Sequence, residues 1–138
     1  MQNMDMSLDQ ILTLASMIQA EAPNSDQMRM VSSVFYNRLN NSGVFPLLQS
    51  DPTGMYVTND ILPYLNIKDD GYYSAYDTYV CTGLPVGPIC NPGLEAIEAA
   101  LDPANSDYYF FVTDAEGNFY YAVTDQEHEI NKKKAGLA

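Results

Sequence analysis

One glutamate stands out as a residue that could act as a general acid. Glu21 lies in the apolar segment of residues 14–22, LASMIQAEA, and is the only carboxylate between Asp9 and Asp26. If this segment is a helix, Glu21 lies in its last turn, where the helix dipole disfavours negative charge and raises a carboxyl pKa. A carboxyl group with a raised pKa is suited to donate a proton near neutral pH. A solvent-facing glutamate at a helix end has the same pattern, so spacing alone leaves both interpretations open.

A second carboxylate and several tyrosines could contact a sugar. Asp51 lies in the polar segment of residues 48–53, LQSDPT, where it could form a simple Asx turn or accept hydrogen bonds from sugar hydroxyls. Aromatic rings match the apolar face of a pyranose, so the tyrosines of the polar middle could stack on one. These are Tyr56, Tyr76 and Tyr79, whereas Tyr108, Tyr109, Tyr120 and Tyr121 have the pattern of half-buried sheet residues.

The remaining chemistry-bearing residues have simple structural interpretations. His128 is the only histidine, so a zinc site or a Ser-His-Asp triad would depend on it alone, and a lone helical histidine is typical of packing or surface positions. Cys81 and Cys90 could close a disulfide loop in an oxidising compartment, but we expect free thiols because the core looks sufficient without one. The run of residues 132–134, KKK, is typical of a helix end that complements its dipole.

Composition excludes several classes of function. The 138 residues carry 18 Asp and Glu against 6 Lys and Arg, a net charge of −12 that repels nucleic acid and anionic lipid surfaces. Neutral or cationic partners, glycans among them, stay open. No apolar run reaches the roughly 18 residues that span a bilayer, and the N-terminus lacks a signal-peptide pattern. We therefore expect one soluble domain with a hydrophobic core.

The elements that must position these residues follow from periodicity and capping. Ser7 and Gln10 form a capping box for a helix at about 8–22, and Asn91 and Pro92 are favoured residues to open a later one. We expect helices at about 8–22 and 26–40, and a last helix from a Thr124–Glu127 capping box to about 134. The helix that Asn91 and Pro92 open should end at Asp102 and Pro103, with Leu94, Ile97, Ala100 and Leu101 inward. Strands 107–113 and 119–123 should form a hairpin through a turn at 115–118. The fold class predicted is α+β: a single compact domain with helices around a small antiparallel sheet.

The middle of the chain, residues 43–91, is expected to be ordered but irregular. It contains five prolines, which leave room only for short elements: a strand at 47–49, a helical turn near 59–65 and extended pieces around 78–81. Long irregular stretches in compact domains are usually functional or disordered, and the many tyrosines argue against disorder. We interpret it as the segment that forms a cleft.

The order of the motifs resembles a known family. Along the chain come LASMIQAEA at 14–22, VFYNRL at 34–39, LQSDPT at 48–53, YDTY at 76–79, GLPVGPI at 83–89, NPG at 91–93, YYFFV at 108–112 and a helix with Glu127 and His128. Together they are similar to the YceG-like family of MltG-type endolytic murein transglycosylases, over roughly residues 8–134. Ala75 and Asp77 differ from the Pro and Asn usual in that family, and Val86 replaces a Pro.

The resemblance implies a reaction and a set of site residues. Such enzymes cleave peptidoglycan between N-acetylmuramic acid and N-acetylglucosamine without water, which leaves a 1,6-anhydromuramic end, and they need no metal or cofactor. The family's catalytic acid/base corresponds to Glu21. The implied cleft residues are Gln49, Asp51, Thr53, Tyr76, Thr78, Tyr79 and Asn91, of which Asn91 would also cap a helix.

The resemblance also implies a setting for the chain. Family members begin with a membrane anchor and a LysM-like segment, both absent here, so residues 1–138 are expected to be an excised YceG-like catalytic domain. Its partners would be peptidoglycan strands and cell-wall synthases at the extracytoplasmic face of a bacterial membrane, with no nucleic acid. Two alternatives stay open: a muramidase that uses Asp51 as a second carboxylate, and a glycan-binding module with an inactive cleft.

Overall fold

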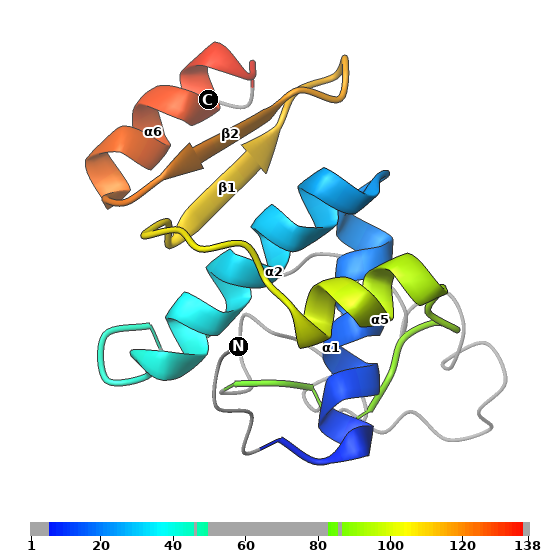
Figure 1. The fold of residues 1–138 in the computed structure, drawn as a ribbon. Helices are drawn as coiled ribbons and strands as arrows, with labels where there is room; N and C mark the ends of the chain where they lie inside the picture. The colour runs from blue at the N-terminus through cyan, green and yellow to red at the C-terminus, as the bar shows by residue number, and fades with distance from the viewer. Residues whose placement is uncertain (1–5, 46, 50–82, 86, 137–138) are drawn as a thin grey trace, which may run out of the picture.

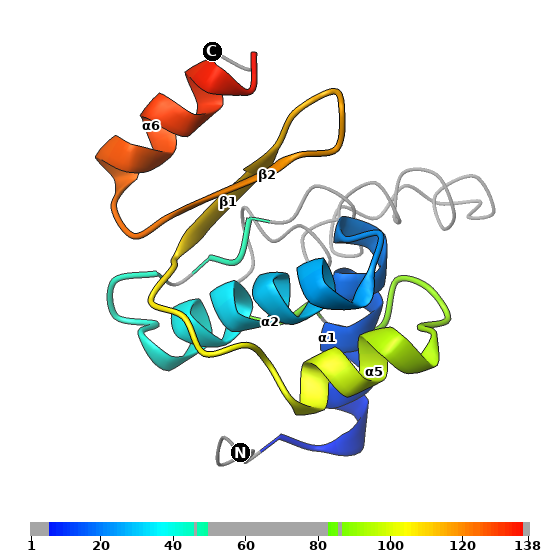
Figure 2. The ribbon, with the colours of Figure 1, turned by 45° about the horizontal axis from the view of Figure 1, so that its top comes forward.

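The protein has an α+β fold, as the sequence predicts. The computed structural model describes residues 6–45, 47–49, 83–85 and 87–136. In chain order, the described elements are α1 (Leu8–Glu21), α2 (Ser25–Asn40), α5 (Leu94–Leu101), β1 (Phe110–Thr113), β2 (Phe119–Ala122) and α6 (Asp125–Lys134). Figures 1 and 2 show two parts: a group of three helices, α1, α2 and α5, and a second layer of the hairpin and α6. The expected elements at 59–65 and 78–81 lie outside the described residues.

The three-helix group holds the core. The Ser7 hydroxyl accepts a hydrogen bond from the Gln10 N–H at 3.2 Å, and the Gln10 side chain accepts one from the Ser7 N–H at 2.9 Å, so the predicted capping box starts α1. The Asn24 side chain caps α2 by accepting a hydrogen bond from the Gln27 N–H at 3.0 Å. The largest fully buried apolar side chains come from these two helices: Leu14, Met17, Ile18, Val31, Val34 and Phe35.

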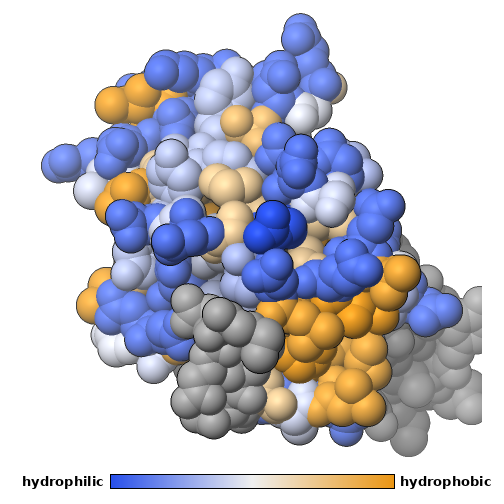
Figure 3. Space-filling view, in the orientation of Figure 1, coloured by the Kyte–Doolittle hydropathy of each residue, from blue (hydrophilic) through white to orange (hydrophobic). Residues whose placement is uncertain are grey.

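Helix α5 corrects two predictions. Its buried residues are Ala96, Ala99 and Ala100, whereas Leu94 and Leu101 are 70% and 43% exposed, so the expected inward leucine face is wrong. The small alanines let α5 pack closely on α1 and α2. Apolar surface gathers in Figure 3 where Figure 1 places α5 and α1.

The start of α5 also differs from the prediction. Gly93 rather than Asn91 is the N-cap, without a side-chain cap. The Gly93 N–H donates instead to the Gln19 side chain of α1 at 2.9 Å, and a Cβ at Gly93 would lie 3.1 Å from that oxygen. The contact with α1 therefore decides where the helix begins.

The second layer is the hairpin covered by α6. Strands β1 and β2 pair antiparallel, with Phe110 opposite Ala122 and Thr113 opposite Phe119. Gly117, at φ +89°, completes the predicted turn. The Thr124 hydroxyl accepts from the Glu127 N–H at 3.2 Å at the start of α6, as expected. None of the helices in the described part of the chain is long and apolar enough to cross a membrane.

Candidate active site

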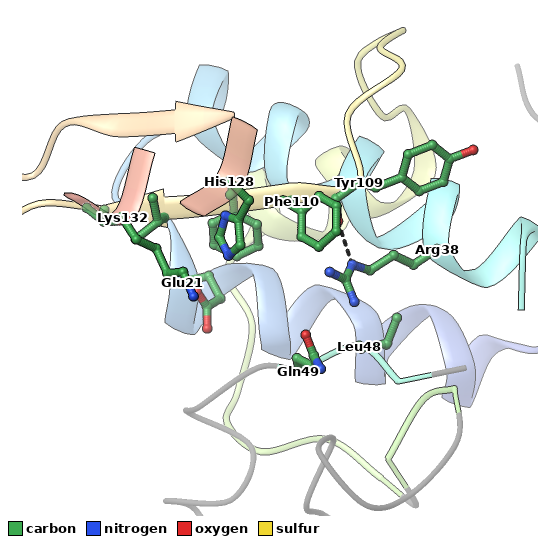
Figure 4. Close-up of a pocket in the computed structure, with 11 residues that line it drawn as sticks. Glu21, Arg38, Leu48, Gln49, Tyr109, Phe110, His128 and Lys132 are labelled. Atoms are coloured by element: carbon green, nitrogen blue, oxygen red, sulfur yellow. Dashed lines mark hydrogen bonds between the residues drawn. The ribbon is translucent and has the colours of Figure 1, made fainter. Parts of the chain in front are cut away.

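A pocket lies where the two layers meet. Its volume is about 410 Å³, and it is bounded by the end of α1, the 47–49 segment, β1 and α6. Figure 4 shows the side chains of α6 and β1 on one side and those of α1 and the 47–49 segment on the other. The described residues that line it are Glu21, Arg38, Leu48, Gln49, Tyr109, Phe110, Phe111, Val112, Thr113, His128 and Lys132.

Glu21 is the one carboxylate among these lining residues. It is the last residue of α1 and is half-buried, and α1 has no basic residue in its last turn. The helix places it there because Ala22 turns extended, at φ −130° and ψ 140°, just before Pro23. Its predicted position at the wall of a pocket is thus found in the structure, whereas its raised pKa stays a prediction.

The 47–49 segment presents Gln49 to the same pocket. Gln49 has φ 58° and is the only non-glycine residue with positive φ among those the structure describes. Such a backbone conformation costs free energy and persists only where surrounding contacts hold it. Residues held in this way are frequent at functional sites. Here Leu48 is 3% exposed and anchors the segment, while Leu47 forms a parallel bridge with Gly83.

Arg38 of α2 connects the two sides of the pocket. Its Nε donates to the Tyr109 carbonyl at 2.6 Å, and its Nη1 donates to the Leu47 carbonyl at 2.8 Å. The guanidinium also lies over two rings, 5.2 Å from the Phe45 centroid and 4.9 Å from that of Phe110. Because Arg38 is only 6% exposed, it acts as a buried clamp on the start of β1 and on the segment that carries Gln49.

His128 of α6 forms part of the opposite wall. Its ring stacks on Phe110 with centroids 4.8 Å apart. Its Nδ1 is buried and has no hydrogen-bond partner in the described structure. Burial lowers the pKa of His128 most, and the charge of Lys132 lowers it further; Glu129 and Asp125 oppose this in part, and Arg38 adds the smallest lowering effect. The imidazole is therefore held in its neutral form.

The sequence matches one family model over almost its whole length. The model is that of the YceG-like family, and the match covers residues 1–134. The chain belongs to the YceG-like family. Two of its relatives are proteins named endolytic murein transglycosylase. That of Bacillus subtilis (strain 168) is 39% identical over 128 residues, and that of Streptococcus pneumoniae (strain D39) is 32% identical over 133 residues.

This YceG-like chain corresponds to a part of those proteins. The alignments cover 93% and 92% of the chain but 35% of the Bacillus protein and 24% of the Streptococcus protein. The crystal structure of a yceG-like protein of Listeria monocytogenes has the same fold, with a TM-score of 0.73 and 39% sequence identity. That match covers 91% of the chain and 39% of the Listeria protein.

The structure brings together some of the predicted site residues of this YceG-like chain. Glu21 and Gln49 line one pocket. Asn91 is exposed and is not among the residues that line it. Five predicted residues lie outside the described part of the chain: Asp51, Thr53, Tyr76, Thr78 and Tyr79.

Three basic residues that line the pocket were not predicted as site residues: Arg38, His128 and Lys132. Arg38 follows Val31 and Val34 at helical spacing, so its place on a buried stripe was a signal for a buried cation. Lys132 follows His128 by four residues, which puts both on one face of α6. The sequence does not show that this face of α6 turns toward β1 and the pocket.

The described residues offer little for metal or thiol chemistry. No group of three or more His, Cys, Asp or Glu residues in that part of the chain could hold a metal ion. Cys90 is an exposed free thiol, as expected, and its Sγ donates to the Ser16 carbonyl at 3.3 Å. Cys81 lies outside the described residues.

We predict that the stability of the protein falls as the pH drops below about 6.5, because of His128. The unfolded chain binds a proton at His128 near pH 6.5, whereas the folded chain binds it only at lower pH. The contribution is fully present above about pH 7 and is lost as the pH falls through the folded pKa. His128→Phe keeps a ring against Phe110 and removes the titration.

Urea unfolding at pH 7.5 and pH 5.5 measures this effect. The wild type should lose more free energy of unfolding between the two pH values than His128→Phe does. Since His128 is the only histidine, no other imidazole titrates in this window. Equal losses in the two proteins would contradict the prediction.

Proposed function

We propose that this chain is the catalytic part of a lytic transglycosylase that cleaves peptidoglycan strands between N-acetylmuramic acid and N-acetylglucosamine. The observation that carries the proposal is Glu21 at the wall of a 410 Å³ pocket, in a YceG-like chain that is 39% identical to a protein named endolytic murein transglycosylase. The enzyme would act at the extracytoplasmic face of the membrane, where its substrate lies. Residues 1–138 are the proposed catalytic domain.

In the proposed reaction, Glu21 is both acid and base. Its carboxyl group gives a proton to the oxygen that joins muramic acid C1 to the next sugar, and the C1–O bond breaks. The C6 hydroxyl of the same muramic acid attacks C1, and its proton passes to the Glu21 carboxylate. The attacking group is already part of the substrate, so it benefits from a high effective concentration. One carboxylate completes the cycle, and the product is a 1,6-anhydromuramic end.

The other predicted residues would bind the strand. We propose that Gln49, Asp51 and Thr53 hold sugar hydroxyls from one side of the cleft, and that the segment with Tyr76, Thr78 and Tyr79 holds the strand from another. Asn91 is kept as a proposed sugar contact outside the described pocket. The positive φ of Gln49, held in place by the buried side chain of Leu48, supports this assignment.

The experiment that tests the function is mass spectrometry of peptidoglycan digested with the wild-type chain. We expect muramic ends that are one water lighter than reducing ends. Reducing ends would contradict the proposal and favour a muramidase with two carboxylates. Binding of strands without any product would contradict it in favour of a glycan-binding module.

Asp51 is expected to support the reaction rather than to attack the sugar. Asp51 precedes Pro52, which biases it toward an extended backbone whose side chain can accept hydrogen bonds. An ionised Asp51 would help to keep Glu21 protonated. Asp51→Asn should therefore retain anhydro products at a rate lower by about tenfold. Complete loss of activity in a folded, glycan-binding Asp51→Asn variant would exclude the supporting role, and a glycosyl ester trapped on Asp51 would indicate a retaining hydrolase.

A further inference from the structure

The described residues that line the pocket carry a net positive charge, whereas the whole protein is acidic. The whole chain has 18 acidic residues against 6 Lys and Arg and a single His. Among the described residues that line the pocket, Glu21 is the one acid, whereas Arg38 and Lys132 are cations and His128 is the only histidine of the chain. Two of six cations thus meet in one pocket of an acidic protein. Such an arrangement favours a ligand with a negative group.

The two cations differ in what they can do. Arg38 is 6% exposed, and its guanidinium is engaged by backbone carbonyls and aromatic faces, so it supplies a fixed positive charge. The Lys132 side chain is 33% exposed and extends from α6 on a flexible stem. Figure 4 shows the Lys132 and Glu21 side chains pointing toward one another at the same end of the pocket. Lys132 is the cation able to reach a ligand that lies against Glu21.

The present partner of Lys132 leaves it able to bind another carboxylate. Its Nζ lies 2.6 Å from the Glu129 carboxylate, which is 50% exposed and one helical turn away. A solvent-exposed pair of this kind contributes little free energy, and an ammonium group has three donors. A substrate carboxylate can therefore share or replace Glu129 at small cost.

We propose that Lys132 binds a carboxylate carried by the lactyl arm of the muramic acid that reacts at Glu21, an inference that rests on the function proposed above. Of the two sugars in the strand, only muramic acid has this arm, on the same ring as the bond to be cut. The carboxylate is that of the lactyl group itself in strands without peptides, or that of an attached peptide. Contact with Lys132 would place muramic acid, rather than N-acetylglucosamine, on the side of the scissile bond where the anhydro ring forms.

Binding measurements test this assignment without turnover. In a Glu21→Gln background, Lys132→Met is compared with Lys133→Met, which removes an exposed lysine of the same turn that does not line the pocket. Titration calorimetry uses three glycans of equal length: strands with peptides, strands stripped of peptides by an amidase, and chitooligosaccharide, which has no lactyl arm.

We expect Lys132→Met to weaken binding of a carboxylate-bearing strand about five- to tenfold, less at high salt, and to leave chitooligosaccharide binding unchanged. Lys132→Arg should retain most of the affinity for the carboxylate-bearing strand. Lys133→Met should retain all of this affinity. The source of the carboxylate is identified by which strand, with peptides or without them, loses affinity for Lys132→Met. Circular dichroism and urea midpoints confirm that the variants are folded.

Three results would overturn the inference: equal losses for Lys132→Met and Lys133→Met, the same loss on chitooligosaccharide, or no binding of either carboxylate-bearing strand. The proposed function fails separately. If the wild type cuts no strand while binding of the carboxylate depends on Lys132, the contact between Lys132 and the carboxylate stands and the transglycosylase proposal does not. If the wild type forms anhydro ends and Lys132 has no effect on binding, the reverse holds.

Discussion

Replacing Glu21 with glutamine is expected to reduce glycan cleavage by about a thousandfold or more while the fold is retained. The amide keeps the size of the side chain at the end of α1 but cannot give a proton to the leaving oxygen or take one from the C6 hydroxyl. Since Glu21 is the one carboxylate among the described lining residues, none of those residues offers a substitute. The measurement is the rate of formation of anhydromuramic ends by mass spectrometry.

The control is Glu116→Gln, which neutralises an exposed glutamate in the hairpin turn that is not among the residues that line the pocket. This variant should cut at the wild-type rate. A Glu21→Gln variant that binds strands and still cleaves them at more than about a tenth of the wild-type rate would refute Glu21 as the acid/base.

Replacing Arg38 with methionine is expected to lower the free energy of unfolding by about 2–4 kcal/mol. The substitution keeps an apolar stem in a buried site but leaves the Tyr109 and Leu47 carbonyls without their donors. It also removes the cation from the faces of Phe45 and Phe110. The loss should be seen as a lower midpoint in urea unfolding. Because Arg38 holds both β1 and the 47–49 segment, activity should fall as well.

The matched control for Arg38 is the other arginine of α2. Arg29 pairs with Asp102 at 3.5 Å, but both side chains are exposed, at 45% and 73%. Arg29→Met should cost less than about 1 kcal/mol, the range of exposed ion pairs. If the two variants lose the same stability, Arg38 is not the clamp described here.

Local structure could be predicted well from the sequence. The Ser7–Gln10 capping box, the 115–118 turn and the Thr124 cap each involve residues three or four positions apart. The interactions that start a helix or close a hairpin are complete within such a window. The bounds of α1, α2 and α6 therefore agree with the predicted ranges to within about one residue.

Contacts between elements account for the errors. Helical spacing of the apolar residues predicts Leu94 and Leu101 inside, but the close approach of α1 and α2 selects the alanine face. Asn91 is a good cap by propensity, yet Gln19 supplies a hydrogen bond to Gly93 instead. Local preference is a weak energy, and a packed tertiary contact overrides it.

The sequence by itself determined the family, the α+β class and the helix whose last turn carries Glu21, and it led to the proposal that Glu21 is the acid. These depend on the order of motifs and on short-range periodicity. Only the tertiary structure decided that Arg38 clamps the pocket and that His128 and Lys132 of α6 line the same pocket as Glu21. The physical reason is that a pocket wall is made by side chains distant in the sequence, whose meeting depends on how whole helices and strands pack.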